Sequence, residues 1–337
     1  MSKALGLPKL GMIFSVIIAI VYGFMFNAIQ ANTIASAFAN TFNVKEGTVG
    51  IIVAIIAGFI IFGGIRRIAD VTSLLVPIMA TAYIGLAIFI IITNITLVPS
   101  MFKIIFENAF GLRAIGGATL GTAILNGIRR GLFSNEAGMG SVPNASSTAD
   151  VDHPAEQGLI QALGVYMNTI VVCSATAFII ILGGESIYAD PNLQGLAITQ
   201  NALAVHVGPW AHTFLTICIF MFAFSSVIGN YYYGESNIEH LGLGKTKLKI
   251  YRGLVLIMVY LGCVGDFSVV WNTGDIFMGI MAIINLVVLF KLGKISVETY
   301  NDYFVQLKAG KTPVFKVSNI KSLKGLENEI ECWEKEI

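Results

Sequence analysis

The sequence contains little charge. Only 12% of its 337 residues are charged, about half of the roughly 25% that is typical of a soluble domain. Hydrophobic residues make up 55% of the chain. This composition excludes both a soluble enzyme of this size and a disordered chain. The formal net charge of +1 provides no basic surface for binding a nucleic acid.

Paired cysteines and catalytic motifs are also missing. The four cysteines lie far apart, with no CxxC pair and no nearby cluster of Cys and His. Neither a disulfide framework nor a zinc site is therefore indicated. The HExxH, GxSxG and Walker-type motifs are absent as well. We therefore expect neither an enzyme nor a cofactor.

Long apolar runs dominate what the sequence does contain. A membrane-spanning helix needs about 20 mostly apolar residues, and eight stretches approach this length. They are residues 12–36, 48–64, 71–94, 114–128, 158–182, 209–233, 253–270 and 276–290. This pattern predicts an all-α polytopic membrane protein in contact with lipid, with about eight spanning helices. We expect a transmembrane core over residues 1–292 and a polar tail over residues 293–337.

The Lys and Arg residues predict the orientation, because cytoplasmic loops carry an excess of them. With the N-terminus inside, most of these residues face the cytoplasm, including Arg129, Arg130 and Lys291. Residues 183–208 contain no Lys or Arg, as expected of an external loop. The sequence thus predicts a multi-pass protein of the plasma membrane, the inner membrane of a prokaryote, with a cytoplasmic C-terminal tail.

The predicted spans contain almost no ionisable side chains, which argues against a proton relay or a voltage sensor. They contain instead clusters of amides, hydroxyls and glycines. These are Asn27, Gln30 and Thr33, then Gly116, Gly117 and Gly121, then Ser225, Ser226 and Asn230. Neutral oxygens beside broken helices can bind Na⁺ and a zwitterionic solute. Alternatively, the same residues pack and cross-link helices.

One polar stretch carries a family resemblance. Residues 129–141 (RRGLFSNEAGMGS) resemble the signature of the sodium:alanine symporter family. Residues 30–35 (QANTIA), 63–68 (GGIRRI), 222–226 (FAFSS) and 232–235 (YYGE) also resemble that family, in the same order.

The resemblance implies a leucine-transporter-like inverted-repeat fold and Na⁺-coupled uptake of alanine, glycine or a similar small neutral amino acid. It implies no cofactor other than Na⁺ as the coupling ion. The implied substrate-binding residues are Gln30, Gly116, Gly117 and Asn230, the last at a position where some members have Trp. The implied Na⁺-binding residues are Ser225 and Ser226. The residues with a signature or gating role are Ser134, Asn135, Glu136 and Gly138.

Two of these expectations have alternatives. Glu136 could act in an inner gate, or it could form an ion pair or helix cap in an ordinary loop after Arg129 and Arg130. Family members are longer than this chain, so we expect a partial fold without its first helices and impaired transport by the short form. An inactive membrane remnant and a passive channel for small solutes are the alternatives. The sequence does not indicate an oligomeric state.

Overall fold

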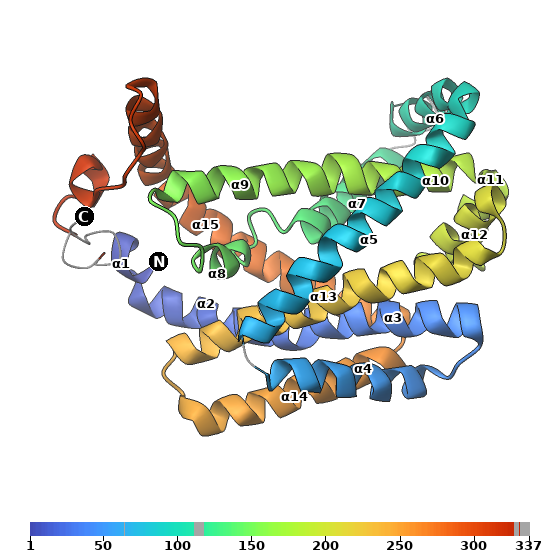
Figure 1. The fold of residues 1–337 in the computed structure, drawn as a ribbon, viewed down its shortest axis with the longest axis horizontal. Coiled ribbons are helices and arrows are strands. Elements are labelled where there is room, and N and C mark those ends of the chain that lie inside the picture. The colour runs from blue at the N-terminus through green and yellow to red at the C-terminus, as the bar shows by residue number, and fades with distance from the viewer. Residues whose placement is uncertain (64, 111–117, 327–329, 331–337) are drawn as a thin grey trace.

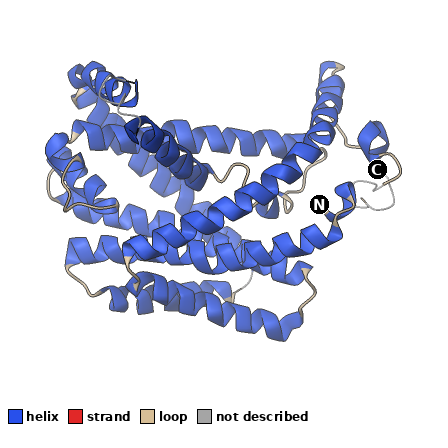
Figure 2. Cartoon of the chain, turned by 180° about the vertical axis from the view of Figure 1, so that it is seen from behind, coloured by secondary structure: helices blue, strands red, loops and turns tan. Residues whose placement is uncertain are grey.

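The chain folds into a bundle of helices. The structure, a computed structural model, describes residues 1–63, 65–110, 118–326 and 330. Every regular element within these ranges is a helix and none is a strand, as Figure 2 shows from behind. The prediction of an all-α polytopic membrane protein is therefore confirmed.

One layer of the bundle is built from two long rods and two shorter helices (Figure 1). The first rod is continuous and comprises α2 (Pro8–Ile20), the π-helix η1 (Val21–Phe26) and α3 (Asn27–Phe42). Helix α13 (Trp210–His240) packs along it, and α14 (Gly244–Val264) packs on both α3 and α4 (Glu46–Ile61). Small and branched side chains such as Ala31, Val227 and Val255 fill the space between these helices.

The remaining helices cover that layer (Figure 1). Helix α5 (Ile65–Thr93) packs on α13 and on another continuous rod in which a π-helix lies between two α-helices. This rod comprises α9 (Pro154–Tyr166), the π-helix η4 (Met167–Cys173) and α10 (Ser174–Leu182). Helix α15 (Phe267–Lys308) runs beside η1 and α9. The shorter elements are α1 (Ser2–Leu5), η2 (Ile95–Leu97), α6 (Val98–Phe110), α7 (Ala118–Asn135), α8 (Val142–Ser146), α11 (Glu185–Tyr188), α12 (Leu196–Val207), η5 (Val317–Asn319) and η6 (Lys321–Leu323).

Most of the predicted spans overlap a helix or a rod, but the span 253–270 crosses the break between α14 and α15. Residues 64 and 114–117, which belong to two other predicted spans, lie outside the described residues. Within the described residues, five helices are long and apolar enough to cross a membrane: Pro8–Phe42, Val76–Thr93, Pro154–Leu182, Trp210–His240 and Phe267–Lys308. Helix α4, with 16 residues, is shorter than a typical span of about 20. The number of spans therefore stays a prediction.

The segment 183–208, which its lack of Lys and Arg predicts to be an external loop, is partly helical. It contains α12, whose Gln200 and Leu203 are fully buried. The Gln200 amide nitrogen donates hydrogen bonds to the hydroxyls of Thr41 on α3 and Thr216 on α13, both at 3.0 Å. The absence of cationic side chains therefore reflects burial of part of this segment as well as its position.

The polar tail is partly packed against the bundle. Helix α15 runs without interruption past residue 292 to Lys308. The chain then turns back and buries Phe315, Val317 and Ile320, with Ala4 and Ile295 packed against them. The proposed boundary between core and tail at residue 292 falls inside this helix and stays a prediction.

Candidate functional site: an unwound segment between two π-helices

The family-like stretch interrupts a helix. Helix α7 ends at Asn135 and α8 begins at Val142. Between them, Glu136, Gly138 and Gly140 have φ values of 53°, 84° and 85°. These left-handed conformations end a helix and leave backbone groups without helical partners. We call residues 136–141 the unwound segment.

Glycine is required at position 140 for two reasons. Its positive φ disfavours any side chain. A Cβ atom there would also lie 2.7 Å from Cζ of Phe14 and 2.8 Å from Oδ1 of Asn285. The unwound segment therefore lies directly against α2 and α15.

Side chains from two neighbouring elements hold the unwound segment. The Glu136 carboxylate accepts hydrogen bonds from the Tyr22 hydroxyl on η1 at 3.1 Å and from the Ser141 hydroxyl at 2.6 Å. The Asn285 amide on α15 donates to the Gly138 carbonyl at 2.9 Å. Met139 is fully buried between these elements. Glu136 is therefore packed inside the bundle.

The end of α7 meets the second π-helix. The Asn168 amide of η4 donates to the Ser134 carbonyl and, at 3.0 Å, to the Ser134 hydroxyl. The Asn135 amide donates to the Thr169 hydroxyl at 3.2 Å. The signature stretch thus lies between η1 and η4. Isolated π-helical turns within longer helices often occur at functional sites.

A tyrosine from α14 accounts for the π-helical turn in the first rod. The Tyr251 hydroxyl donates to the Ala19 carbonyl at 2.8 Å, just before η1 begins. A Cβ atom on Gly23 or Gly234 would lie 1.9 or 1.7 Å from that hydroxyl. The Asn27 amide donates to the Gly23 carbonyl at 3.2 Å. A side chain inserted in this way is a known cause of irregular turns in helices.

The predicted orientation requires Arg130 to lie on the same side of the membrane as the Lys residues of α15. The structure places Arg130 elsewhere along that helix. Helix α7 continues past Arg129 and Arg130 to Asn135. The Arg130 guanidinium pairs with Asp275 on α15 at 2.5 Å and lies 5.2 Å from the ring of Trp271. Lys291 is 16 positions further along the same helix, which corresponds to a rise of about 24 Å. Asp275 therefore supplies the charge partner of Arg130.

The predicted substrate-binding residues lie on adjacent helices where they are described. Gln30 is half-buried on α3, and α3 packs against α13, which carries Asn230. Asn230 is only 4% exposed, and its amide nitrogen has no hydrogen-bond partner among the described residues. Gly116 and Gly117 lie outside the described residues.

The predicted Na⁺-binding serines bond to their own helix. The hydroxyls of Ser225 and Ser226 donate to the Phe222 carbonyl at 2.8 and 3.1 Å. Such bonds are common for serine in helices. Both serines remain half-buried, and each hydroxyl oxygen keeps acceptor capacity that a cation could use.

Sequence reasoning missed two residues that hold the unwound segment, Tyr22 and Asn285. It also missed Asn168, which bonds to the end of α7, and Tyr251, which bonds next to η1. A signal was present for Asn168 and Asn285, because each is an amide within a predicted apolar span. An amide in a bilayer needs a polar partner. For Tyr22 and Tyr251 the sequence gives no comparable signal, because tyrosines are common at the ends of spans.

Comparison with known proteins supports the assignment that the signature stretch suggests. The model of the sodium:alanine symporter family matches residues 1–317. The amino-acid carrier protein AlsT of Bacillus subtilis is 48% identical over 334 residues, which are 99% of this chain and 70% of AlsT.

Two further relatives differ in the amino acid that their names give. The probable sodium/glutamine symporter GlnT of Bacillus subtilis is 46% identical over 333 residues, 99% of this chain and 68% of GlnT. The sodium/alanine symporter AgcS of Methanococcus maripaludis is 36% identical over 273 residues, 81% of this chain and 60% of AgcS.

Proposed function

Because this chain belongs to the sodium:alanine symporter family, a family of transporters and not of enzymes, we propose that it carries out Na⁺-coupled symport of alanine, glycine or a similar small neutral amino acid into the cell. The unwound segment is the observation that carries this proposal. Transporters of several folds bind substrate where a spanning helix is interrupted, because the interruption exposes backbone groups. Here the interruption lies inside the bundle, between η1 and η4.

The substrate site in this proposal combines backbone and amide groups. The unwound segment offers backbone groups that no helix engages, while Gln30 and Asn230 offer amides from α3 and α13. The unpartnered amide nitrogen of Asn230 can donate to a substrate carboxylate. Gly116 and Gly117 remain in the proposal as backbone contributors.

Ser225 and Ser226 form the Na⁺ site in this proposal. Their hydroxyl protons are directed to the Phe222 carbonyl, so the oxygen lone pairs are the groups left for a cation. Hard cations such as Na⁺ prefer neutral or anionic oxygen ligands, as Ca²⁺ and Mg²⁺ do. Ser134, Asn135, Glu136 and Gly138, which bond to η4, η1 and α15, act in gating in this proposal.

Transport can be tested with the purified chain in proteoliposomes. We expect radiolabelled alanine to accumulate when an inward Na⁺ gradient is imposed, and not when K⁺ replaces Na⁺. Unlabelled glycine and glutamine, added as competitors, test the substrate range. Flux that only equilibrates would identify a passive channel, and no flux would identify an inactive remnant. Either result contradicts the proposal.

The Na⁺ site has a matched control on the same helix. Replacing Ser226 by Ala should raise the Na⁺ concentration for half-maximal uptake about tenfold, the effect of losing roughly 1.4 kcal/mol of ligand binding. Ser236 also donates to its own helix, to the Tyr233 carbonyl at 3.0 Å. The S236A variant should leave the Na⁺ dependence unchanged. Equal effects of both substitutions would remove Ser226 from the Na⁺ site.

A further inference from the structure

The segment after α15 returns to the bundle and touches the beginning of α9. We call residues 311–326 the C-terminal strap. Its Phe315, Val317 and Ile320 are buried. The backbone N–H of Phe315 donates to the carbonyl of Asp152 at 3.0 Å. The strap is thereby attached to the residues that connect α8 with α9.

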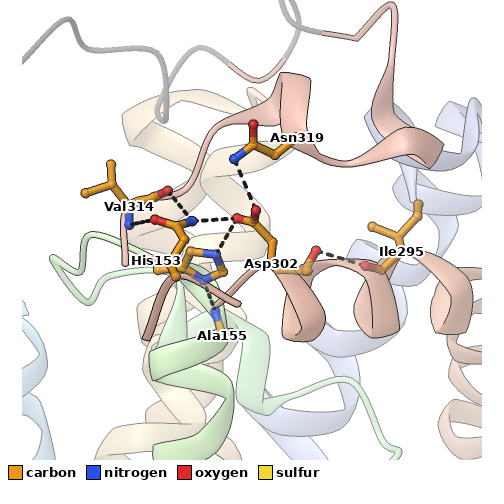
Figure 3. A network of polar contacts seen from close by, with 8 residues as sticks. His153, Ala155, Ile295, Asp302, Val314 and Asn319 are labelled. Carbon is orange, nitrogen blue, oxygen red and sulfur yellow. Dashed lines mark hydrogen bonds and ion pairs between the residues drawn. The ribbon is translucent and has the colours of Figure 1, made fainter. Parts of the chain in front are cut away.

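A single carboxylate joins the strap, α15 and the start of α9 (Figure 3). Asp302 on α15 accepts hydrogen bonds from His153 at 3.3 Å, from Gln306 at 2.8 Å and from Asn319 of the strap at 3.1 Å. Gln306 also exchanges two hydrogen bonds with the backbone of Val314, at 3.0 and 2.9 Å. The strap therefore depends on a network with His153 at its other end.

The position of the proton on His153 is fixed by its two neighbours. Its Nδ1 atom accepts a hydrogen bond from the backbone N–H of Ala155 at 3.1 Å, so the ring is the N-cap of α9. Its Nε2 atom then carries the proton and donates to Asp302. The ring is fully buried, with the rings of Tyr303 and Phe315 at 5.1 and 5.3 Å.

We propose that His153 is a proton-operated latch, in which protonation of Nδ1 removes the cap of α9 and releases the C-terminal strap. A doubly protonated imidazolium donates from both nitrogens. Its Nδ1–H would face the N–H of Ala155, so two donors would oppose each other and the capping bond would be lost. The ring would then leave its position between Tyr303 and Phe315, and the strap contacts at Asp152 and Asp302 would loosen.

The charges around the ring set the direction of the pH dependence. Burial lowers the pKa of His153, although Asp302 on α15 and Glu156 on α9 raise it. When the strap is released, the ring returns to water and to an ordinary pKa of about 6.5. The docked state thus binds the proton less tightly than the released state. Docking is therefore complete at neutral pH and weakens as the pH falls below about 6.5.

Amide hydrogen exchange of the full chain in nanodiscs tests the latch. After correction for the intrinsic exchange rate, protection of peptides from residues 311–323 should fall about fivefold between pH 7.5 and pH 5.5. This is the effect of losing one helix cap. Asn is an efficient N-cap without a titrating group, so H153N should show the same protection at both pH values. The control H240N, which changes an exposed histidine, should behave like the unsubstituted chain.

A second variant keeps the test decisive if H153N is poorly folded. Asp302→Asn retains an acceptor for Nε2–H but removes the charge that raises the pKa of His153. The docked ring then binds the proton less tightly still, whereas the released ring is unchanged. The loss of protection between pH 7.5 and pH 5.5 should therefore be larger in D302N than in the unsubstituted chain, which a purely structural contact would not cause. The latch is refuted if the unsubstituted chain shows no pH-dependent loss of protection, or if the loss in D302N is no larger than in the unsubstituted chain. Amide hydrogen exchange is measured without any transport of substrate. Failure of the latch can therefore be distinguished from failure of the proposed transport function.

Discussion

At the scale of single residues, Glu136 connects both ends of the unwound segment to η1. The same carboxylate oxygen accepts from Tyr22 and from Ser141. Glu136 also has a left-handed backbone, with φ of 53°, which is uncommon for a residue other than glycine. Such strain persists only where the surroundings enforce it, and it is frequent at functional sites. We therefore expect the carboxylate to act on movement more than on substrate binding.

Replacing Glu136 by Gln tests this role. The amide keeps the shape but accepts hydrogen bonds less strongly than a carboxylate, so the maximal uptake rate should fall about tenfold. The KM for the amino acid should change little. Y22F removes the other partner of the same bond, so the double variant should lose little more than the more impaired single variant. Additive losses, or an equal change in KM and rate, would argue against a role in gating.

Residue roles were the part of the site that the sequence predicted least completely. The importance of residues 134–138 could be inferred from the resemblance, whereas their contacts with η1, η4 and α15 could not. An Arg–Arg pair before a polar stretch is typical of a cytoplasmic loop, but Asp275 gives Arg130 a partner on α15. Asp275 is 145 positions away along the chain, and no local pattern reveals such a partner.

At the scale of elements, the bond from Tyr251 to Ala19 holds the π-helical turn that directs Tyr22 towards Glu136. Gly234 belongs to the YYGE stretch, and the structure shows why it has no side chain. The Tyr251 hydroxyl occupies the place of a Cβ atom at that position. The glycine therefore serves the packing of α14 against α13 and η1.

Substitution of this glycine should be costly. In G234A the added methyl group would lie 1.7 Å from the Tyr251 hydroxyl and 2.8 Å from Cζ, so we expect a loss of about 1–3 kcal/mol from overpacking. A lower thermal unfolding midpoint in detergent measures this loss. The control G253A on α14 meets no atom within 4 Å and should be neutral or stabilising. If G234A matches G253A, the close packing is not essential.

The positions of the helices were largely predictable, because apolar runs of about 20 residues are a strong local signal. Their interruptions were not. The π-helix η1 results from the contact with Tyr251, 232 positions away from Ala19. The helix α12 is short, and its buried Gln200 depends on hydroxyls from α3 and α13. Features of this kind arise from tertiary contacts and leave no periodic pattern in the sequence.

At the scale of the whole molecule, the two ends of the bundle differ. The N-terminus, residues 311–326 and the turn between α13 and α14 lie at one end, whereas α11, α12 and the turn between α3 and α4 lie at the other (Figure 1). The excess of Lys on the first end predicts that it faces the cytoplasm. This orientation remains a proposal, and it can be tested because both ends offer exposed positions.

Labelling with a membrane-impermeant maleimide tests the orientation. The native cysteines are first replaced by serine, and a single thiol is then introduced by N192C or K247C, both at exposed positions. In intact cells we expect labelling of the N192C variant alone. The K247C variant should react only after the membrane is permeabilised. The opposite pattern would invert the proposed topology.

The length of α15 has a consequence for the latch. With 42 residues, the helix measures about 63 Å, roughly twice the thickness of the hydrocarbon layer of about 30 Å. Even a strongly inclined α15 therefore projects beyond the lipid, and its polar last turns are the part suited to water. Asp302 and its partners then stand in the adjoining aqueous compartment, where the acidity of that compartment acts on His153 without any ion having to cross the bilayer.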